Sequence, residues 1–219
     1  DKWLLATVLF GPSMVALIQN DYDKARRLAE FNLELYEEIG NVIGPTMPLI
    51  VLGYAALARG ELEDARGFYL RCLKISQETG FPYGIQMATK YLCKVTLSLG
   101  DLVEAEKYLF QSLKITKKIG FVRDIVNLLY EYARLHAVRG NPEDAVELLA
   151  LVIGHSASQQ YRIVEGRIRD SARNLLAELE NDLSPEAYTA ALERGWELGL
   201  DEVIESLSPR LAIARRNNI

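Results

Sequence analysis

The chain of 219 residues contains only two cysteines and two histidines. Two cysteines cannot form a disulfide framework, and a chain of this length buries enough surface to fold without one. Basic residues are also in the minority, with 25 Lys and Arg against 30 Asp and Glu. Because affinity for nucleic acid comes largely from basic side chains that neutralise phosphates, this balance argues against direct nucleic-acid binding.

Long apolar runs are missing as well. A membrane-spanning helix needs about 20 consecutive apolar residues, and the most apolar stretch, residues 3–18, is interrupted by Gly11 and Pro12. We therefore expect a soluble, cytoplasmic protein without a membrane partner. The chain begins with Asp1 rather than Met, which indicates a piece of a longer protein.

The motifs of common catalytic sites are also absent. The sequence has no Gly-x-x-x-x-Gly-Lys-[Ser/Thr] and no Gly-x-Gly-x-x-Gly segment to hold a nucleotide. His136 and His155 lie in different segments, and no pair of His or Cys has the spacing of a zinc site. We expect no catalytic residue, no metal and no cofactor. An enzyme whose site is assembled across distant segments is the least favoured alternative.

The chain does contain an internal repeat. Turn-forming segments recur at residues 20–22, 60–62, 100–102 and 140–142, and Gly40, Gly80 and Gly120 lie midway between them. Between the turns, apolar residues recur at helical spacing. Glycine directly after such a run suits the left-handed conformation that ends a helix. Each unit therefore predicts a helical hairpin, and the hairpins are expected at about 1–40, 41–80, 81–120 and 121–154.

Small residues recur at two fixed positions of each unit. They are Ser13, Gly53, Cys93 and Ala133 on the first helix and Ala25, Ala65, Ala105 and Ala145 on the second. Small side chains allow two helices to approach closely. Cys72 and Cys93 occupy positions that are small or compact in the other units, and His136 occupies a core-facing position. We interpret all three as structural residues.

This pattern resembles the tetratricopeptide repeat (TPR) family over residues 3–154. The chain departs from the family in its period, which is about 40 residues against about 34 in the common unit. It also lacks the usual Trp near the start of the first helix. The longer period is similar to the arrays attached to bacterial signal-transduction ATPases of the STAND class, such as maltose-regulon activator-like proteins. The resemblance implies an all-α fold, namely a right-handed superhelix of helical hairpins (an α-solenoid) with C-terminal capping helices.

Residues 155–219 are expected to form a degenerate fifth hairpin and a C-terminal capping helix. Ser184 and Pro185 predict the start of a helix, as N-cap and first residue. That helix is expected to stop near Gly195, and a last helix is expected to begin at about Asp201. The pattern Ala-x-x-x-Gly followed by Leu-Asp-Glu in residues 191–202 resembles the closing segment of STAND-type arrays. A polar cap of this kind protects the end of a repeat array.

The resemblance places ligand recognition in a concave groove lined by the first helix of each hairpin. The groove-facing residues that it implies are Met47, Ile50, Tyr54, Met87, Lys90, Lys94, Asn127, Tyr130 and Arg134. Lys90, Lys94 and Arg134 would bring positive charge into an acidic protein, which suits an acidic or mixed peptide. The alternative is that these cations are merely solvated.

A second candidate face consists of Arg162, Arg169 and Arg173, which share one side of a helix by their spacing. Acidic residues nearby make a salt-bridged surface the favoured interpretation of these arginines.

These implications favour a sensor domain of a bacterial STAND-type signalling ATPase or transcriptional regulator. It would bind a peptide, a protein or a small inducer in the groove and would not itself catalyse a reaction. The ATPase domain would lie outside these residues. The alternative is a free-standing TPR scaffold for protein–protein interaction. The sequence does not identify the ligand, the oligomeric state or the effector domain. It also does not show whether the groove or another face is used.

Overall fold

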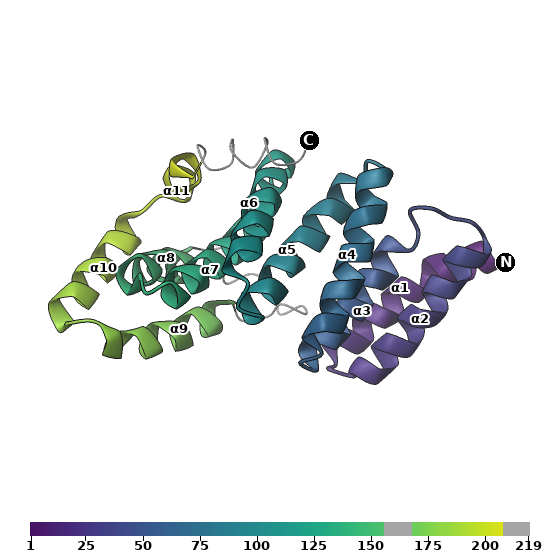
Figure 1. The fold of residues 1–219 in the computed structure, drawn as a ribbon, viewed down its shortest axis with the longest axis horizontal. Helices are drawn as coiled ribbons and strands as arrows, with labels where there is room; N and C mark the ends of the chain where they lie inside the picture. Colours follow the sequence, from purple (N-terminus) through teal and green to yellow (C-terminus); the bar gives the residue numbers. More distant parts are fainter. Residues whose placement is uncertain (156–167, 208–219) are drawn as a thin grey trace. The chain divides into compact units, whose positions relative to one another are not determined.

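The computed structural model describes residues 1–155 and 168–207, and every regular element within these ranges is a helix. The chain divides into two compact units, Asp1–Asp101 and Leu102–Ile219. The first unit contains α1 (Lys2–Ile18), α2 (Tyr22–Glu38), α3 (Thr46–Ala58), α4 (Leu62–Glu78) and α5 (Pro82–Ser98) (Figure 1). The second contains α6 (Leu102–Ile119), α7 (Val122–Val138), α8 (Pro142–Gly154), α9 (Ile168–Leu179), the short 3-10 helix η2 (Glu180–Asp182), α10 (Pro185–Glu197) and α11 (Leu200–Ser206). The all-α class is confirmed.

No helix in the described parts of the chain is both long enough and apolar enough to cross a membrane.

The predicted helix ends coincide with residues in the left-handed conformation. Positive φ angles between 63° and 83° occur at Gly40, Gly60, Gly80, Gly100, Gly120 and Gly140. Asn20 has the same role, with φ at 59°. A side chain makes this conformation unfavourable for most residues, whereas Gly and, to a lesser extent, Asn tolerate it. These regularly spaced turns therefore set the ends of α1 to α7.

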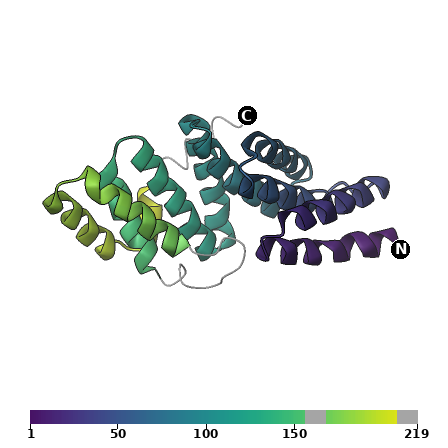
Figure 2. The ribbon, with the colours of Figure 1, turned by 90° about the horizontal axis from the view of Figure 1, so that it is seen from below.

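In the first unit, consecutive helices pack as hairpins that stack on one another. α1 packs on α2 and α3 on α4, while α3 also packs on α2 and α5 on α4. Figure 2 shows α1 and α2 side by side, as the contacts require. The predicted small residues of both hairpins are buried. A Cβ at Gly44 would lie 2.2 Å from Cδ1 of Tyr36, so glycine at this position lets α3 settle against α2.

In the second unit, α7 packs on α6 and α8, α10 runs along α8, and α9 contacts both α7 and α8. Ser184 caps α10 as predicted, since its Oγ accepts a hydrogen bond from the backbone N–H of Ala187 at 3.2 Å. The helix α10 ends at Glu197, close to Gly195 as predicted, and α11 begins at Leu200. A Cβ at Gly195 would lie 2.2 Å from the backbone oxygen of Glu147, so this glycine allows α10 to cross α8 closely.

The expected domain boundary at residues 154/155 stays a prediction. The division into compact units falls instead after Asp101, between the two helices expected for the third hairpin.

Candidate functional site

Six of the predicted groove residues lie on the first helices of the second and third hairpins, within the first unit. They are Met47, Ile50 and Tyr54 of α3 and Met87, Lys90 and Lys94 of α5, and we call them the α3–α5 face. Their helical spacing places them on one side of each helix, and α3 contacts α5. Ile50 and Lys90 are buried, and the other four side chains are half-buried. The accessible part of this face therefore consists of methionine, tyrosine and lysine side chains that are half-buried, and none of them is fully exposed to solvent.

An aromatic cluster links α3, α4 and α5. The ring of Tyr91 stacks on that of Tyr69, with centroids 5.0 Å apart, and meets the ring of Tyr54 edge-on at 6.0 Å. Nζ of Lys90 lies 4.9 Å from the centroid of Tyr91, within the range of a cation–π contact. Sequence reasoning missed Tyr91. The available signal was an aromatic residue at a position where the neighbouring unit has Val51.

Lys94 carries a charge that no carboxylate offsets. It is half-buried, and within residues 1–155 and 168–207 no acidic oxygen lies within ion-pair distance of its ammonium group. Arg26 of α2 differs, since its guanidinium contacts Glu30 at 3.0 Å and Glu61 at 3.3 Å. The ammonium of Lys94 can therefore bind a carboxylate of a partner without first breaking an ion pair of its own.

The three groove residues predicted on α7 lie in the second unit and have closer partners. Nη1 of Arg134 lies 2.6 Å from Oε2 of the buried Glu131, so the charge of Arg134 is offset locally. The Tyr130 hydroxyl hydrogen-bonds with Ser171 of α9. Burial, and after it the negative charge of Glu131, raises the pKa of Tyr130. Asn127 is half-buried on the same helix. In this unit α9 covers part of the predicted face.

The second candidate face lies only partly in the described chain. Arg162 falls outside it. Arg169 is half-buried, and Arg173 is exposed, with Nη1 4.0 Å from Oδ1 of Asp170. This contact agrees with the interpretation of these arginines as part of a salt-bridged surface.

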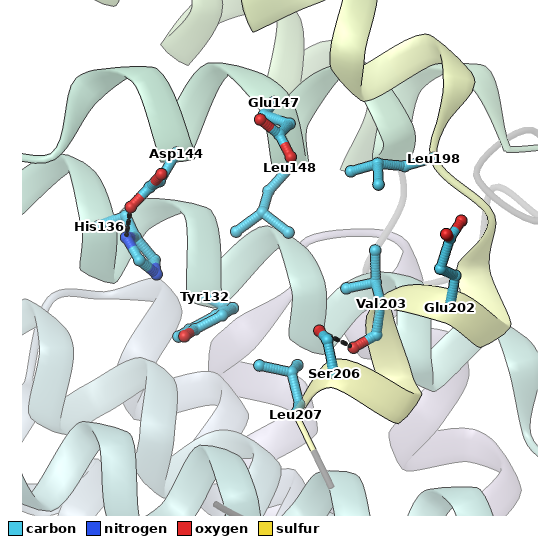
Figure 3. Close-up of a pocket in the computed structure, with 10 residues that line it drawn as sticks. All are labelled: Tyr132, His136, Asp144, Glu147, Leu148, Leu198, Glu202, Val203, Ser206 and Leu207. Carbon is cyan, nitrogen blue, oxygen red and sulfur yellow. Dashed lines mark hydrogen bonds and ion pairs between the residues drawn. The ribbon is translucent and has the colours of Figure 1, made fainter. Parts of the chain in front are cut away.

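The second unit also contains a pocket of about 290 Å³ that the sequence did not predict (Figure 3). It lies between α7, α8 and the segment from the end of α10 through α11. Its apolar wall consists of Tyr132, Leu148, Leu198, Val203 and Leu207, and its polar groups are His136, Asp144, Glu147, Glu202 and Ser206.

His136 stands on the wall of this pocket. Its Nδ1 lies 3.2 Å from Oδ2 of Asp144, and its ring meets that of Tyr132 edge-on, with centroids 4.5 Å apart. The first three units have Ala16, Ala56 and Thr96 at this position. The packed ring agrees with a structural role, and the pocket adds an imidazole that faces a cavity. Such a site can hold a small ligand with an apolar body and a cationic or hydrogen-bonding group.

Neither cysteine is exposed to solvent. Cys72 and Cys93 are both buried, and burial raises the pKa of the Cys72 thiol to about 12, against a smaller opposing effect of its hydrogen bond with Ser76. A thiol that stays protonated is neither a nucleophile nor a metal ligand. In the described residues, no group of three or more His, Cys, Asp and Glu side chains is arranged to hold a metal ion.

Helical hairpins stacked through columns of small residues define an α-solenoid. Two stretches of the chain, residues 46–70 and 127–150, match the model of the tetratricopeptide repeat. The first stretch covers α3 and the first half of α4. The second stretch covers most of α7 and most of α8. No curated protein matches the chain. The matches support the tetratricopeptide repeat family, and repeats of this kind suggest a scaffold for protein–protein interaction.

Proposed function

We propose that this chain binds an acidic or mixed peptide segment of a partner protein across the α3–α5 face. The observation that carries the proposal is the half-buried residue Lys94, whose ammonium lacks an ion pair in the described chain and which lies on the same side of α5 as the half-buried Met87. Methionine adapts to varied apolar surfaces, and a cation without an ion pair of its own adds specificity for a carboxylate. Tyr54 supplies an aromatic contact of the kind enriched in protein interfaces.

The test is titration of the whole chain with a library of acidic and mixed peptides, followed by Lys94→Glu. We expect the charge reversal to weaken an acidic hit at least about tenfold, equivalent to roughly 1.4 kcal/mol. Lys74→Glu is the matched control, since Lys74 is an exposed lysine of α4 outside the face. Equal affinities of Lys94→Glu and the original chain for every hit would overturn the proposal.

We further propose that this binding serves a sensor domain of a STAND-type signalling ATPase. The support is the long repeat period and the closing pattern in residues 191–202, both of which resemble such arrays. A partner on the α3–α5 face would shift the array between two states and thereby relieve or impose a block on the ATPase. The free-standing scaffold predicts binding without any such switch.

The two hypotheses differ in the full-length gene and its activity. The sensor requires an upstream Gly-x-x-x-x-Gly-Lys-[Ser/Thr] segment and an ATP hydrolysis rate that changes when the peptide hit is added. Lys94→Glu should abolish that change and leave basal hydrolysis intact. If the gene lacks the nucleotide-binding segment, the free-standing scaffold is the hypothesis that remains.

The pocket of the second unit favours a second candidate function, the binding of a small cationic inducer. His136 replaces the Ala or Thr of the other units and faces this cavity, and Glu202 adds a carboxylate to its lining. If a small cationic compound raises the melting temperature of the chain by binding in the pocket, Glu202→Gln should abolish that rise. The glutamine side chain keeps an oxygen that can accept the hydrogen bond from the N–H of Gly199. Glu205→Gln, one turn away and outside the lining, is the control. If the compound stabilised Glu202→Gln as much as the original chain, the pocket would be excluded as its binding site.

A further inference from the structure

The helix α6 presents a line of lysines on its solvent side. Lys107, Lys114 and Lys118 recur at spacings of seven and four, and Lys117 lies beside them, so all four share one side of the helix. Three of them are exposed, and Lys114 is half-buried. Residues 107–123 contain no Asp or Glu, although the whole chain has 30 of them. We call the four lysines the α6 stripe.

Most of the positive charge of the α6 stripe is not offset by a carboxylate. Nζ of Lys107 lies 2.9 Å from Oε1 of Glu104. In the part of the chain that the structure describes, no acidic oxygen lies within ion-pair distance of Lys114, Lys117 or Lys118. Like charges three and four residues apart destabilise a helix. The helix dipole favours Lys117 and Lys118, which lie in the last turn, but its effect does not extend to Lys114.

The repeat itself does not require positive charge at these positions. The equivalents of the last three lysines are mostly acidic or neutral, namely Glu34, Glu37 and Glu38 on α2 and Lys74, Gln77 and Glu78 on α4. All three helices nevertheless form and pack on the next helix of the chain. The fold therefore tolerates either sign here, and the charge of the α6 stripe is a property of its surface rather than a condition of folding.

Charge and exposure together define what this surface can bind. Cations without carboxylates of their own suit the carboxylates of another molecule. Phe121 and Val122, each 44% exposed, follow shortly after Lys118 and add apolar area. An extended polyanion, such as nucleic acid or an anionic membrane, would also meet the rest of this unit, where residues 168–207 contain ten acidic residues and only three arginines. A short acidic segment of a protein avoids that repulsion.

We propose that the α6 stripe is a second docking surface, which binds a short acidic segment of a partner protein. An apolar side chain of that segment would contact Phe121 or Val122 beside the stripe. The surface lies on the second helix of a hairpin, in the second unit, and does not include Lys94. Binding here and the proposed peptide binding on the α3–α5 face can therefore succeed or fail independently.

The first test titrates a fluorescent peptide of glutamates around one phenylalanine into the Lys94→Glu chain at low ionic strength, so that the α3–α5 face does not contribute. Changing Lys114, Lys117 and Lys118 to Gln should raise the dissociation constant about tenfold, because three attractions are lost. The matched control removes equal charge from exposed residues of α2 and α4, by changing Lys24, Arg27 and Lys74 to Gln. It should bind like its parent. No binding by the parent, or equal losses in both variants, would overturn the proposal.

The second test reverses the charges on both sides of the contact. With Lys114, Lys117 and Lys118 changed to Glu, which α2 has at the same three positions, the chain should lose the glutamate peptide and bind its lysine counterpart. Failure to gain the lysine peptide would place recognition elsewhere and overturn the proposal. A DNA duplex and phosphatidylserine vesicles are the competing probes, and both should bind the original chain more weakly than the glutamate peptide does. Tighter binding of either probe would refute a protein segment as the ligand.

Discussion

The ring of Tyr69 occupies the space that a side chain at residue 53 would need. A Cβ on Gly53 would lie 2.5 Å from Cε1 of Tyr69, which is completely buried. In the second unit the equivalent pair is Ala133 and Leu149, both also buried. The first and second helices of a hairpin thus share a fixed volume, and a larger residue on one requires a smaller residue on the other.

Gly53→Ala should therefore lower the free energy of unfolding by about 1 to 3 kcal/mol, as overpacking typically does. Helix propensity alone predicts the opposite, since Ala is favoured over Gly by about 1 kcal/mol. Adding Tyr69→Leu should restore part of the loss, because the double variant reproduces the Ala133 and Leu149 pair. Urea unfolding of the two single variants and the double variant measures the coupling. Purely additive losses would contradict a shared volume.

Gly195→Ala should loosen α10 from α8. The Cβ would lie 2.2 Å from the backbone oxygen of Glu147, which cannot move without disturbing α8. We expect a loss of about 1 to 3 kcal/mol and faster proteolysis near α10. Gly67→Ala is the matched control, because Gly67 lies inside α4 with nothing within 4 Å of a Cβ. It should stabilise the chain by roughly 0.5 to 1 kcal/mol. Equal effects of the two changes would refute the close approach.

Asn20→Val should destabilise the first hairpin by about 1 to 2 kcal/mol, because a branched residue is strained in the left-handed conformation. Asn20 has φ at 59°, whereas Gln19 before it has φ at −80°. Gln19→Val therefore tests an exposed valine without that strain, and Asn20→Gly should be nearly neutral. Thermal unfolding distinguishes the three variants. If both valine variants lost the same stability, the conformation of Asn20 would not be the cause.

The buried thiol of Cys72 predicts a loss of stability in alkali. Its pKa is raised to about 12 in the folded chain, whereas an unfolded cysteine titrates near about 8.5. Above that pH the unfolded chain loses a proton that the folded chain keeps, so stability falls as the pH rises from about 8.5 towards 12. The contribution at pH 10 should be on the order of 1 kcal/mol.

Cys72→Val removes this titration, so its unfolding free energy should fall less steeply with pH than that of the original chain. The comparison concerns slopes, because the substitution also changes packing. Parallel slopes between pH 8 and 11 would contradict a protonated Cys72. Thiol labelling at pH 8 gives an independent check, and both cysteines should react only after unfolding.

The helices and their ends could be predicted from the sequence because they depend on local geometry. The periodic glycines Gly40, Gly80 and Gly120 coincide with positive φ angles, and Ser184 with Pro185 begins α10. Ala25 and Ala65 were predicted to be buried, and both are, in hairpins whose two helices pack on each other. In each case the residues that decide the structure lie within one repeat.

The candidate site was predicted less completely, because its chemistry depends on neighbours. Lys94 and Arg134 are equivalent as sequence positions, yet Arg134 has Glu131 at 2.6 Å and Lys94 has no such partner in the described chain. Gly195 lies close to the end of α10, as the sequence predicts, but its close approach to the backbone of α8 became visible only in the structure. One-dimensional patterns do not distinguish these cases.

The sequence by itself determined the all-α class, the repeat unit and the small residues that are buried in the first two hairpins, because periodic glycines and small residues act over short distances along the chain. Only the tertiary structure decided which surfaces are left open. The pocket beside His136 lies where α11 meets α7 and α8, and Leu4 and Val8 of α1 are exposed because no described helix lies against them. Both features depend on the distances between helices. A single sequence predicts where helices begin and end, but it does not give the distances between them.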